Sequence, residues 1–285
     1  MANLKEIRTR IVSVNSTMQI TSAMKMVSAA KLKRAQDAIT KMRPYAEKLQ
    51  EILANVSSSE GSSEFSRSGD EKNVLIVSIT SNRGLCGGFN NNVIKESKSI
   101  AQKQNAKVKI VSLGKKANDV FKRTDWHTTE GLSENPYTIF DNLTYNNASE
   151  IAETLMNQFK SGQYDKIVLV YNKFKNAAVQ VVQTEQFLPV VSSNQTEGSA
   201  EYIFEPEKEQ ILNELIPRSL KVQLFKALLD SQAAEHGARM TAMHKATDNA
   251  SEMVKELKLT YNKARQAAIT GEILEIVAGA EALNG

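Results

Sequence analysis

The sequence predicts an α/β protein with a long antiparallel two-helix coiled coil, in which each helix comes from one terminus. Two observations support this fold class. Both end segments carry apolar and small residues at alternating steps of three and four, the spacing of a coiled-coil seam. Between them, short β-branched runs alternate with helical stretches, which indicates a small α/β domain inserted into the pair. Because neither long helix can bury its seam alone, pairing the two is the economical solution.

The C-terminal helix is predicted over residues 206–285. It opens at Pro206 between two glutamates, which the first turn of a helix favours. After Pro217 no further proline occurs, and a continuous helix from there would extend about 100 Å at 1.5 Å per residue. The seam is formed by Met240, Met243, Thr247, Ala250, Val254, Leu257, Tyr261, Ala264 and Ala268. A rod of this length needs another element to cover its apolar side.

The N-terminal helix is predicted over residues 1–57, and its seam keeps one register for about seven heptads. The register softens over residues 21–28, where Met24 and its neighbours place apolar atoms on other faces. We therefore expect this part of the helix to meet a third surface. Pro44 removes one backbone hydrogen bond, and we expect a kink there and not the end of the helix.

The positive charge of the chain is concentrated in the N-terminal helix. Residues 1–57 hold ten Lys and Arg against four acids, whereas residues 58–206 hold sixteen against seventeen and residues 207–285 ten against eleven. This excess favours an acidic partner, and nucleic acid is a second option. The basic residues interleave with the seam and lack stacking aromatics, so the nucleic-acid interpretation is the weaker one.

A polar linker rich in serine is predicted at residues 58–72, followed by the α/β domain at 73–205. Strands are expected at residues 73–80, 107–113, 166–172, 179–191 and, as a short edge strand, 202–204. Helices are expected at residues 92–104, 115–121 and 147–160, with a loop at 124–145. This alternation predicts a small Rossmann-like domain with a partly parallel sheet between helical layers.

The glycine-rich turn at residues 84–88 is the one segment that resembles a ligand-binding loop, because nucleotide folds hold phosphates between a strand and a helix. It matches neither the dinucleotide fingerprint nor the P-loop, and a structural turn with close backbone approach is the favoured interpretation. Cys86 has no histidine near it in sequence, which favours a small, semi-buried structural thiol. No Cys or His spacing suits a metal and no acid–base pair stands out, so we predict no catalytic residue, cofactor or metal.

The chain has a single cysteine, no basic-then-apolar leader and no apolar window of about 18 residues. These features predict an intracellular protein in a reducing compartment. Such a protein could still be held at a membrane through contacts with other proteins.

The last segment, residues 269–283, contains no basic residue, and its apolar stripe has slipped by one position from the seam before it. The N-terminal helix has about 55 residues against about 80 in the C-terminal one, so roughly the last 20 residues should lack an intramolecular partner. An exposed apolar tip predicts an apolar socket in another protein. The alternative is that the tip folds back on the α/β domain.

Four motifs carry a family resemblance over essentially the full length of the chain. They lie at residues 5–31 (KEIRTRI continuing to ITSAMKMVSAAK), 81–90 (SNRGLCGGFN), 235–250 (EHGARMTAMHKATDNA) and 262–280 (NKARQAAITGEILEIVAGA). With these motifs the chain resembles the gamma subunits of bacterial F-type ATP synthases. Two positions depart from the family pattern: Gly237 replaces the usual Ala or Ser, and His244 replaces an acidic residue.

The resemblance implies a central-stalk rotor subunit that transmits torque between the membrane c-ring and a catalytic ring of alpha and beta subunits. Such a chain is a non-catalytic subunit of an H⁺-transporting two-sector ATPase, with the epsilon subunit as a further partner. It would be peripheral at the cytoplasmic face of the bacterial inner membrane. The residues implied in contacts with beta and alpha subunits are Met24, Lys25, Arg239, Arg265, Gln266, Thr270 and Glu272. The competing hypotheses are a non-enzymatic coiled-coil scaffold and, third, an enzyme that uses the glycine-rich turn.

Overall fold

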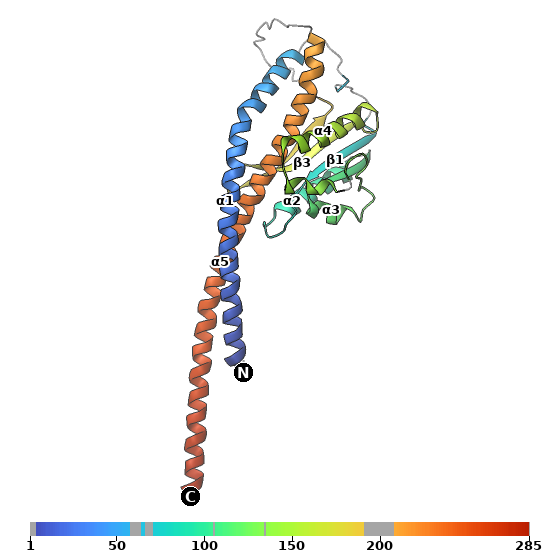
Figure 1. Cartoon of the computed structure of the whole chain (residues 1–285). Helices are drawn as coiled ribbons and strands as arrows, with labels where there is room; N and C mark the ends of the chain where they lie inside the picture. Colours follow the sequence, from blue (N-terminus) through green and yellow to red (C-terminus); the bar gives the residue numbers. More distant parts are fainter. Residues whose placement is uncertain are drawn as a thin grey trace. The chain divides into compact units, whose positions relative to one another are not determined.

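The computed structural model describes residues 4–57, 64–65, 71–104, 106–133, 135–190 and 208–284. The helices are α1 (Leu4–Ser57), α2 (Phe89–Lys103), α3 (Lys115–Phe121), α4 (Tyr145–Lys160) and α5 (Lys208–Asn284), with a 3₁₀ helix η1 (Pro136–Asp141). The strands are β1 (Asn73–Ile79), β2 (Lys107–Leu113), β3 (Lys166–Phe174) and β4 (Gln180–Leu188). The predicted order of long helix, α/β domain and long helix is confirmed (Figure 1). The expected edge strand, most of the linker and the predicted first residues of the C-terminal helix lie outside the described residues.

The chain divides into two compact units, and each long helix runs through both. The base unit comprises residues 28–239, and the rod unit comprises residues 1–27 and 240–285.

The sheet of the base unit has the strand order β2-β1-β3-β4. β1 pairs in parallel with β2 and β3, so that Val77 lies opposite Val111 on one side and Leu169 on the other. β4 pairs antiparallel with β3. The partly parallel sheet is therefore confirmed, and its central strands are continuous apolar runs because helices cover both faces.

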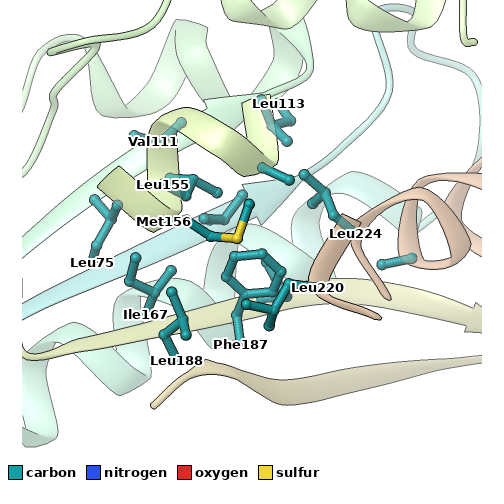
Figure 2. Packing of buried hydrophobic residues seen from close by; sticks show 14 of the residues in the cluster. Leu75, Val111, Leu113, Leu155, Met156, Ile167, Phe187, Leu188, Leu220 and Leu224 are labelled. Carbon is teal, nitrogen blue, oxygen red and sulfur yellow. The ribbon is translucent and has the colours of Figure 1, made fainter. Parts of the chain in front are cut away.

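Alternation along β1 builds two cores, one on each face of the sheet. Leu75, Val77 and Ile79 point into the larger core, which α4 and the first part of α5 close. Figure 2 shows Met156 of α4, Phe187 of β4 and Leu220 and Leu224 of α5 in this cluster. Val74 and Ile76 point the other way, into a core closed by α2 and α3. The predicted helical layers on both sides of the sheet are thus present.

Two helices begin earlier than predicted, and local chemistry explains both starts. α2 begins at Phe89, directly after the glycine-rich turn. α4 begins after Thr144, whose hydroxyl oxygen accepts a hydrogen bond from the Asn147 backbone N–H at 3.3 Å, as an N-cap residue does. The region expected to be a loop contains η1, with Pro136 at its first position.

Within the base unit, late residues of α1 pack against early residues of α5, which is the predicted antiparallel pairing. Ala46 and Leu49 of α1 share a buried cluster with Val222 of α5. α1 continues through Pro44 to Ser57, so the proline does not end the helix, as expected.

Within the rod unit, the predicted seam residues are the buried ones. On α1 these include Ile7 and Thr21, and on α5 they include Met243, Ala250 and Val254. Thr247, a half-buried seam residue, has its hydroxyl 2.9 Å from the hydroxyl of Thr21, a polar contact between the two helices. In the part of the chain described, no helix is both long enough and apolar enough to cross a membrane.

Candidate functional site

The glycine-rich turn connects β1 to α2 at the carboxyl end of β1, and polar contacts hold it from within. The backbone N–H of Ser81 donates to Asn90 Oδ1 at 2.9 Å, and the Ser81 hydroxyl donates to the Arg83 carbonyl at 2.6 Å. Asn90 Nδ2 donates to Cys86 Sγ at 3.2 Å. Asn90 thus joins Ser81, which lies between β1 and the turn, to the thiol of Cys86 in the middle of the turn.

Two residues of this turn have left-handed backbone conformations. Gly87 has φ +60°, which glycine adopts at little cost, but Leu85 has φ +63°, which costs a residue with a Cβ about 1–2 kcal/mol. We expected another part of the chain to pass close to the backbone of these glycines, and at Gly84 and Gly88 this prediction is wrong. A Cβ on Gly84 would meet nothing nearer than Lys116 Cε at 3.9 Å, and one on Gly88 nothing nearer than Asn92 Nδ2 at 3.4 Å.

The guanidinium of Arg239, on α5, holds the turn from outside. Its Nη2 donates to the carbonyls of Arg83 and Gly84, both at 3.1 Å, and its Nε donates to the Gly84 carbonyl at 3.3 Å. Nη1 forms an ion pair with Glu235, one helical turn earlier, at 2.6 Å. Burial raises the pKa of the Glu235 carboxyl, and the positive charge of Arg239 opposes this rise. Both side chains are buried, so this pair is tightly coupled.

This arrangement argues against the nucleotide-binding interpretation. Open α/β sheets bind ligands at the carboxyl ends of strands where the strand order reverses, which here is between β1 and β3. A phosphate site presents backbone N–H donors to the ligand. In this turn, the carbonyls of Arg83 and Gly84 face a protein guanidinium. The turn is a structural feature closed by α5.

Cys86 fits the predicted structural role. Its side chain is buried within the turn, and burial raises the pKa of the thiol. A raised pKa leaves little thiolate, which is the reactive form. In the described chain, no group of three or more His, Cys, Asp or Glu residues is placed to hold a metal ion.

The residues implied in partner contacts lie in two different settings. Met24 and Lys25 are half-buried on α1, while Arg265, Gln266, Thr270 and Glu272 are exposed on α5, all within the rod unit. Arg239 belongs to the base unit and is buried, and its guanidinium binds Glu235 and the carbonyls of Arg83 and Gly84. The structure therefore brings Arg239 together with the glycine-rich turn and not with an exposed surface.

Comparison with known proteins identifies the family. The family profile described as ATP synthase matches residues 3–283. The chain is 62% identical over 294 residues to the ATP synthase gamma chain of Flavobacterium johnsoniae and 60% identical over 291 residues to that of Flavobacterium psychrophilum, and both alignments cover the whole of each chain. The chain belongs to the ATP synthase gamma chain family.

Solved structures agree with this membership. The central stalk and c-ring structure of the Tetrahymena thermophila mitochondrial ATP synthase contains a chain 26% identical, with a TM-score of 0.58, matching 80% of this chain and 99% of that one. A chain in the Euglena gracilis mitochondrial ATP synthase shares the fold at 21% identity, with a TM-score of 0.71 over 98% of this chain and 94% of that one. These findings support the expected central-stalk role and make this gamma-family chain a non-catalytic subunit of an ATP synthase.

Sequence reasoning named Arg239 only as a partner contact, and it missed Glu235, Leu85 and the binding of Arg239 to the turn. Glu235 and Arg239 lie four residues apart on a helix, a spacing at which opposite charges pair. Their ion pair could therefore have been predicted from the sequence. The carbonyls that Arg239 binds lie 155 and 156 residues away, and no local pattern indicates such a contact. Leu85 gave no signal because leucine is not a residue expected at positive φ.

Proposed function

We propose that the chain is the rotor shaft of a proton-translocating F-type ATP synthase, and that it transmits torque between the membrane c-ring and a catalytic ring of three alpha and three beta subunits. The observation that carries this proposal is the exposed apolar end of α5. Its large apolar residues range from 47% exposed at Ile269 to 71% at Ile276.

This end of α5 differs from the rest of the helix in its burial. Val254 is the last buried residue of the described chain. Beyond it, Ile273, Leu274 and Val277 add to an apolar surface that runs around the helix. Apolar patches of this kind mark interaction sites in folded proteins. A socket at the centre of the catalytic ring would cover the tip while leaving it free to turn.

A two-helix shaft also meets the physical requirement for driving three identical sites. A partner shifts the conformation of a site only through contacts that differ between its states. The shaft has no threefold symmetry, since it is built from two unlike helices of different length. Each beta subunit would therefore meet a different face at any moment, and rotation would change those contacts in sequence.

We assign the contacts residue by residue. Met24 and Lys25 would meet the acidic lever region of the beta subunits, to which the basic N-terminal helix is complementary in charge. Arg265, Gln266, Thr270 and Glu272 would bind beta-subunit loops nearer the tip, where they are exposed. Arg239 would act on partners only through the turn that it holds.

The remaining partners follow from the same role. The base unit would contact the epsilon subunit and the c-ring, and the chain would be held at the cytoplasmic face of the inner membrane through that ring. No nucleic acid and no cofactor enter the proposal.

The test is reconstitution of the full chain with the alpha and beta subunits of the same organism. The expected result is a stable complex that hydrolyses ATP, in which imaging places residues 269–283 at the centre of the ring. The isolated chain should not hydrolyse ATP. A chain that hydrolyses ATP by itself, or that does not co-purify with the ring, would contradict the proposal. If the chain were only a scaffold, replacing Arg265 and Gln266 by alanine would leave coupled ATP synthesis unchanged.

A further inference from the structure

We propose that Asp230 of α5 is a pH-sensitive latch between α5 and the β3–β4 hairpin. With a proton, its carboxyl group ties the helix to the hairpin, and without one its buried charge loosens this contact. The inference concerns the base unit alone and goes beyond the proposed function, so that neither depends on the other.

Asp230 lies midway along the line on which α5 meets the hairpin. Residues seven apart on a helix share a face, because seven residues nearly complete two turns. Seven residues before Asp230, Gln223 Nε2 donates to Glu185 Oε1 of β4 at 2.7 Å. Seven residues after it, a Cβ on Gly237 would lie 3.3 Å from the carbonyl oxygen of Ala177 in the hairpin. Asp230 therefore faces the hairpin between these two contacts.

The carboxyl group of Asp230 is buried without a hydrogen-bond partner. The residue is 1% exposed, and in the described parts of the chain neither carboxyl oxygen has a partner. A buried polar group without a partner destabilises a fold, and it does so more strongly when it is charged. Burial accordingly raises the pKa of the Asp230 carboxyl, because the neutral form is the one that tolerates the interior.

Every element packed around Asp230 brings a titratable or charged group. Arg43 on α1, Lys226 on α5 and Lys173 on β3 oppose the rise in its pKa, whereas Glu185 on β4 adds to it. Arg43 and Lys173 are exposed and Lys226 is half-buried, so that water screens their charges. None of the three basic groups is hydrogen-bonded to Asp230, which leaves the carboxylate uncompensated.

Tyr171 of β3 provides the acceptor for the proton of Asp230. Its hydroxyl donates to Glu185 Oε2 at 2.8 Å. Burial and the charges of Glu185 and Asp230 raise the pKa of Tyr171, so the phenol stays protonated. A hydroxyl that donates one hydrogen bond has lone pairs left to accept another. Once protonated from water, Asp230 would turn its side chain and donate to Tyr171 Oη, which completes a chain from α5 through Tyr171 to Glu185.

The sign of the pH dependence follows from the raised pKa. In the unfolded chain the Asp230 carboxyl loses its proton around its ordinary pKa of 3.8, whereas in the folded chain it keeps the proton to higher pH. The stabilisation is therefore present at low pH and is lost as the pH rises through the pKa of the folded state. The latch closes on acidification, and it opens as the pH rises.

Hydrogen exchange of the full chain, followed in peptides from β3 and β4, tests this latch. After correction for the intrinsic exchange rate, opening of the parent hairpin should become more frequent as the pH rises from about 5 to about 8, by up to about tenfold per pH unit. Asp230→Asn keeps the shape without the charge, so the hairpin should open less often than in the parent at the upper end and show a flatter pH dependence. Asp125→Asn, at an exposed aspartate of the same unit, is the matched control and should behave like the parent.

Two exchange results would overturn the latch. The first is the same pH dependence in the parent and in Asp230→Asn, and the second is a variant hairpin that opens more often than the parent hairpin at every pH. A measurement on the parent alone covers the case in which the variant does not fold. In carbon NMR of the chain labelled at its aspartate carboxyls, one resonance should titrate at a higher pH than the others. If all the aspartates titrate together, Asp230 is not held protonated and the inference is wrong.

Discussion

The buried Glu235–Arg239 pair links α5 to the glycine-rich turn, and its energetics can be separated by mutation. Removing one partner of a buried ion pair leaves an uncompensated charge, which costs about 3–5 kcal/mol. Arg239→Met should therefore lower the free energy of unfolding by about 3 kcal/mol or more, because it also leaves two carbonyls without their donor. The measurement is urea denaturation of the full chain.

The control for this prediction is a double variant, Glu235→Gln with Arg239→Met, which removes both charges. It should be more stable than Arg239→Met alone, because no unpaired charge is left in the interior. If the double variant loses as much stability as the sum of the two single changes, the residues do not act as a pair.

His236, the neighbour of Glu235 on α5, should make the stability depend on pH. Burial, with the nearby charges of Arg239 and Lys31, lowers the pKa of its imidazole from 6.5 to about 4. In the unfolded chain the imidazole takes up a proton as the pH falls below about 6.5, whereas in the folded chain it stays neutral until about pH 4. Its contribution to stability is therefore lost progressively between these two values.

The measurement is the melting temperature of the parent chain and of His236→Gln from about pH 7.5 to about pH 4.5, a range that spans most of the titration. As the pH falls, the melting temperature of the variant should rise relative to that of the parent chain, since glutamine does not titrate. Other groups titrate equally in both proteins and cancel in this difference. A difference that stays flat across the range would show that His236 is not held neutral.

At the scale of elements, the β3–β4 hairpin approaches α5 closely at Gly237. A Cβ there would lie 3.3 Å from the Cα and the carbonyl oxygen of Ala177 and 3.5 Å from Phe174 Cε2. Gly237→Ala should change stability little, because a helix-propensity gain of about 1 kcal/mol is offset by this tight contact. Gly237→Val should lose about 2 kcal/mol, since its branched side chain forces the hairpin away.

Urea denaturation of both variants tests this prediction, with Asn249→Ala and Asn249→Val at an exposed position of the same helix as matched controls. The two control variants should differ from each other only by the lower helix propensity of valine, roughly 0.5 kcal/mol. A Gly237→Val variant as stable as the parent would show that the hairpin is not packed on α5 at this position.

The sequence predicted well those helices and strands whose ends are marked by residues within or directly beside them. The strand at residues 107–113 and the helix at 115–121 match β2 and α3 to the residue, because a buried β-branched run and a glycine mark their ends. η1 was missed because its 3₁₀ turns are too short to show a period. The contacts of Arg239 with the turn were not predictable, because they depend on where α5 lies in the folded base unit.

At the scale of the whole molecule, the heptad seams predicted a coiled coil and also predicted that its longer helix would end without a partner. The described structure agrees, since the buried seam of the rod unit ends at Val254 while α5 continues to Asn284. What the seam does not predict is which protein covers the free end, because apolar complementarity alone fits many sockets. Our proposal that a catalytic ring covers it rests on four sequence motifs and on the family to which the chain belongs.

The apolar tip gives the prediction that best separates a rotor shaft from a packing element. Ile273 and Ile276 are 55% and 71% exposed, so replacing both by aspartate should leave the free energy of unfolding of the isolated chain within about 0.5 kcal/mol of the parent value. In the assembled synthase the same carboxylates would be forced into an apolar socket, where an unpaired charge is costly. ATP synthesis coupled to the proton gradient should therefore fall at least tenfold, measured in membrane vesicles. The conservative pair Ile273→Leu with Ile276→Leu keeps the apolar surface and should retain most of the activity. If the aspartate variant synthesised ATP at the parent rate, the tip would not turn inside an apolar socket.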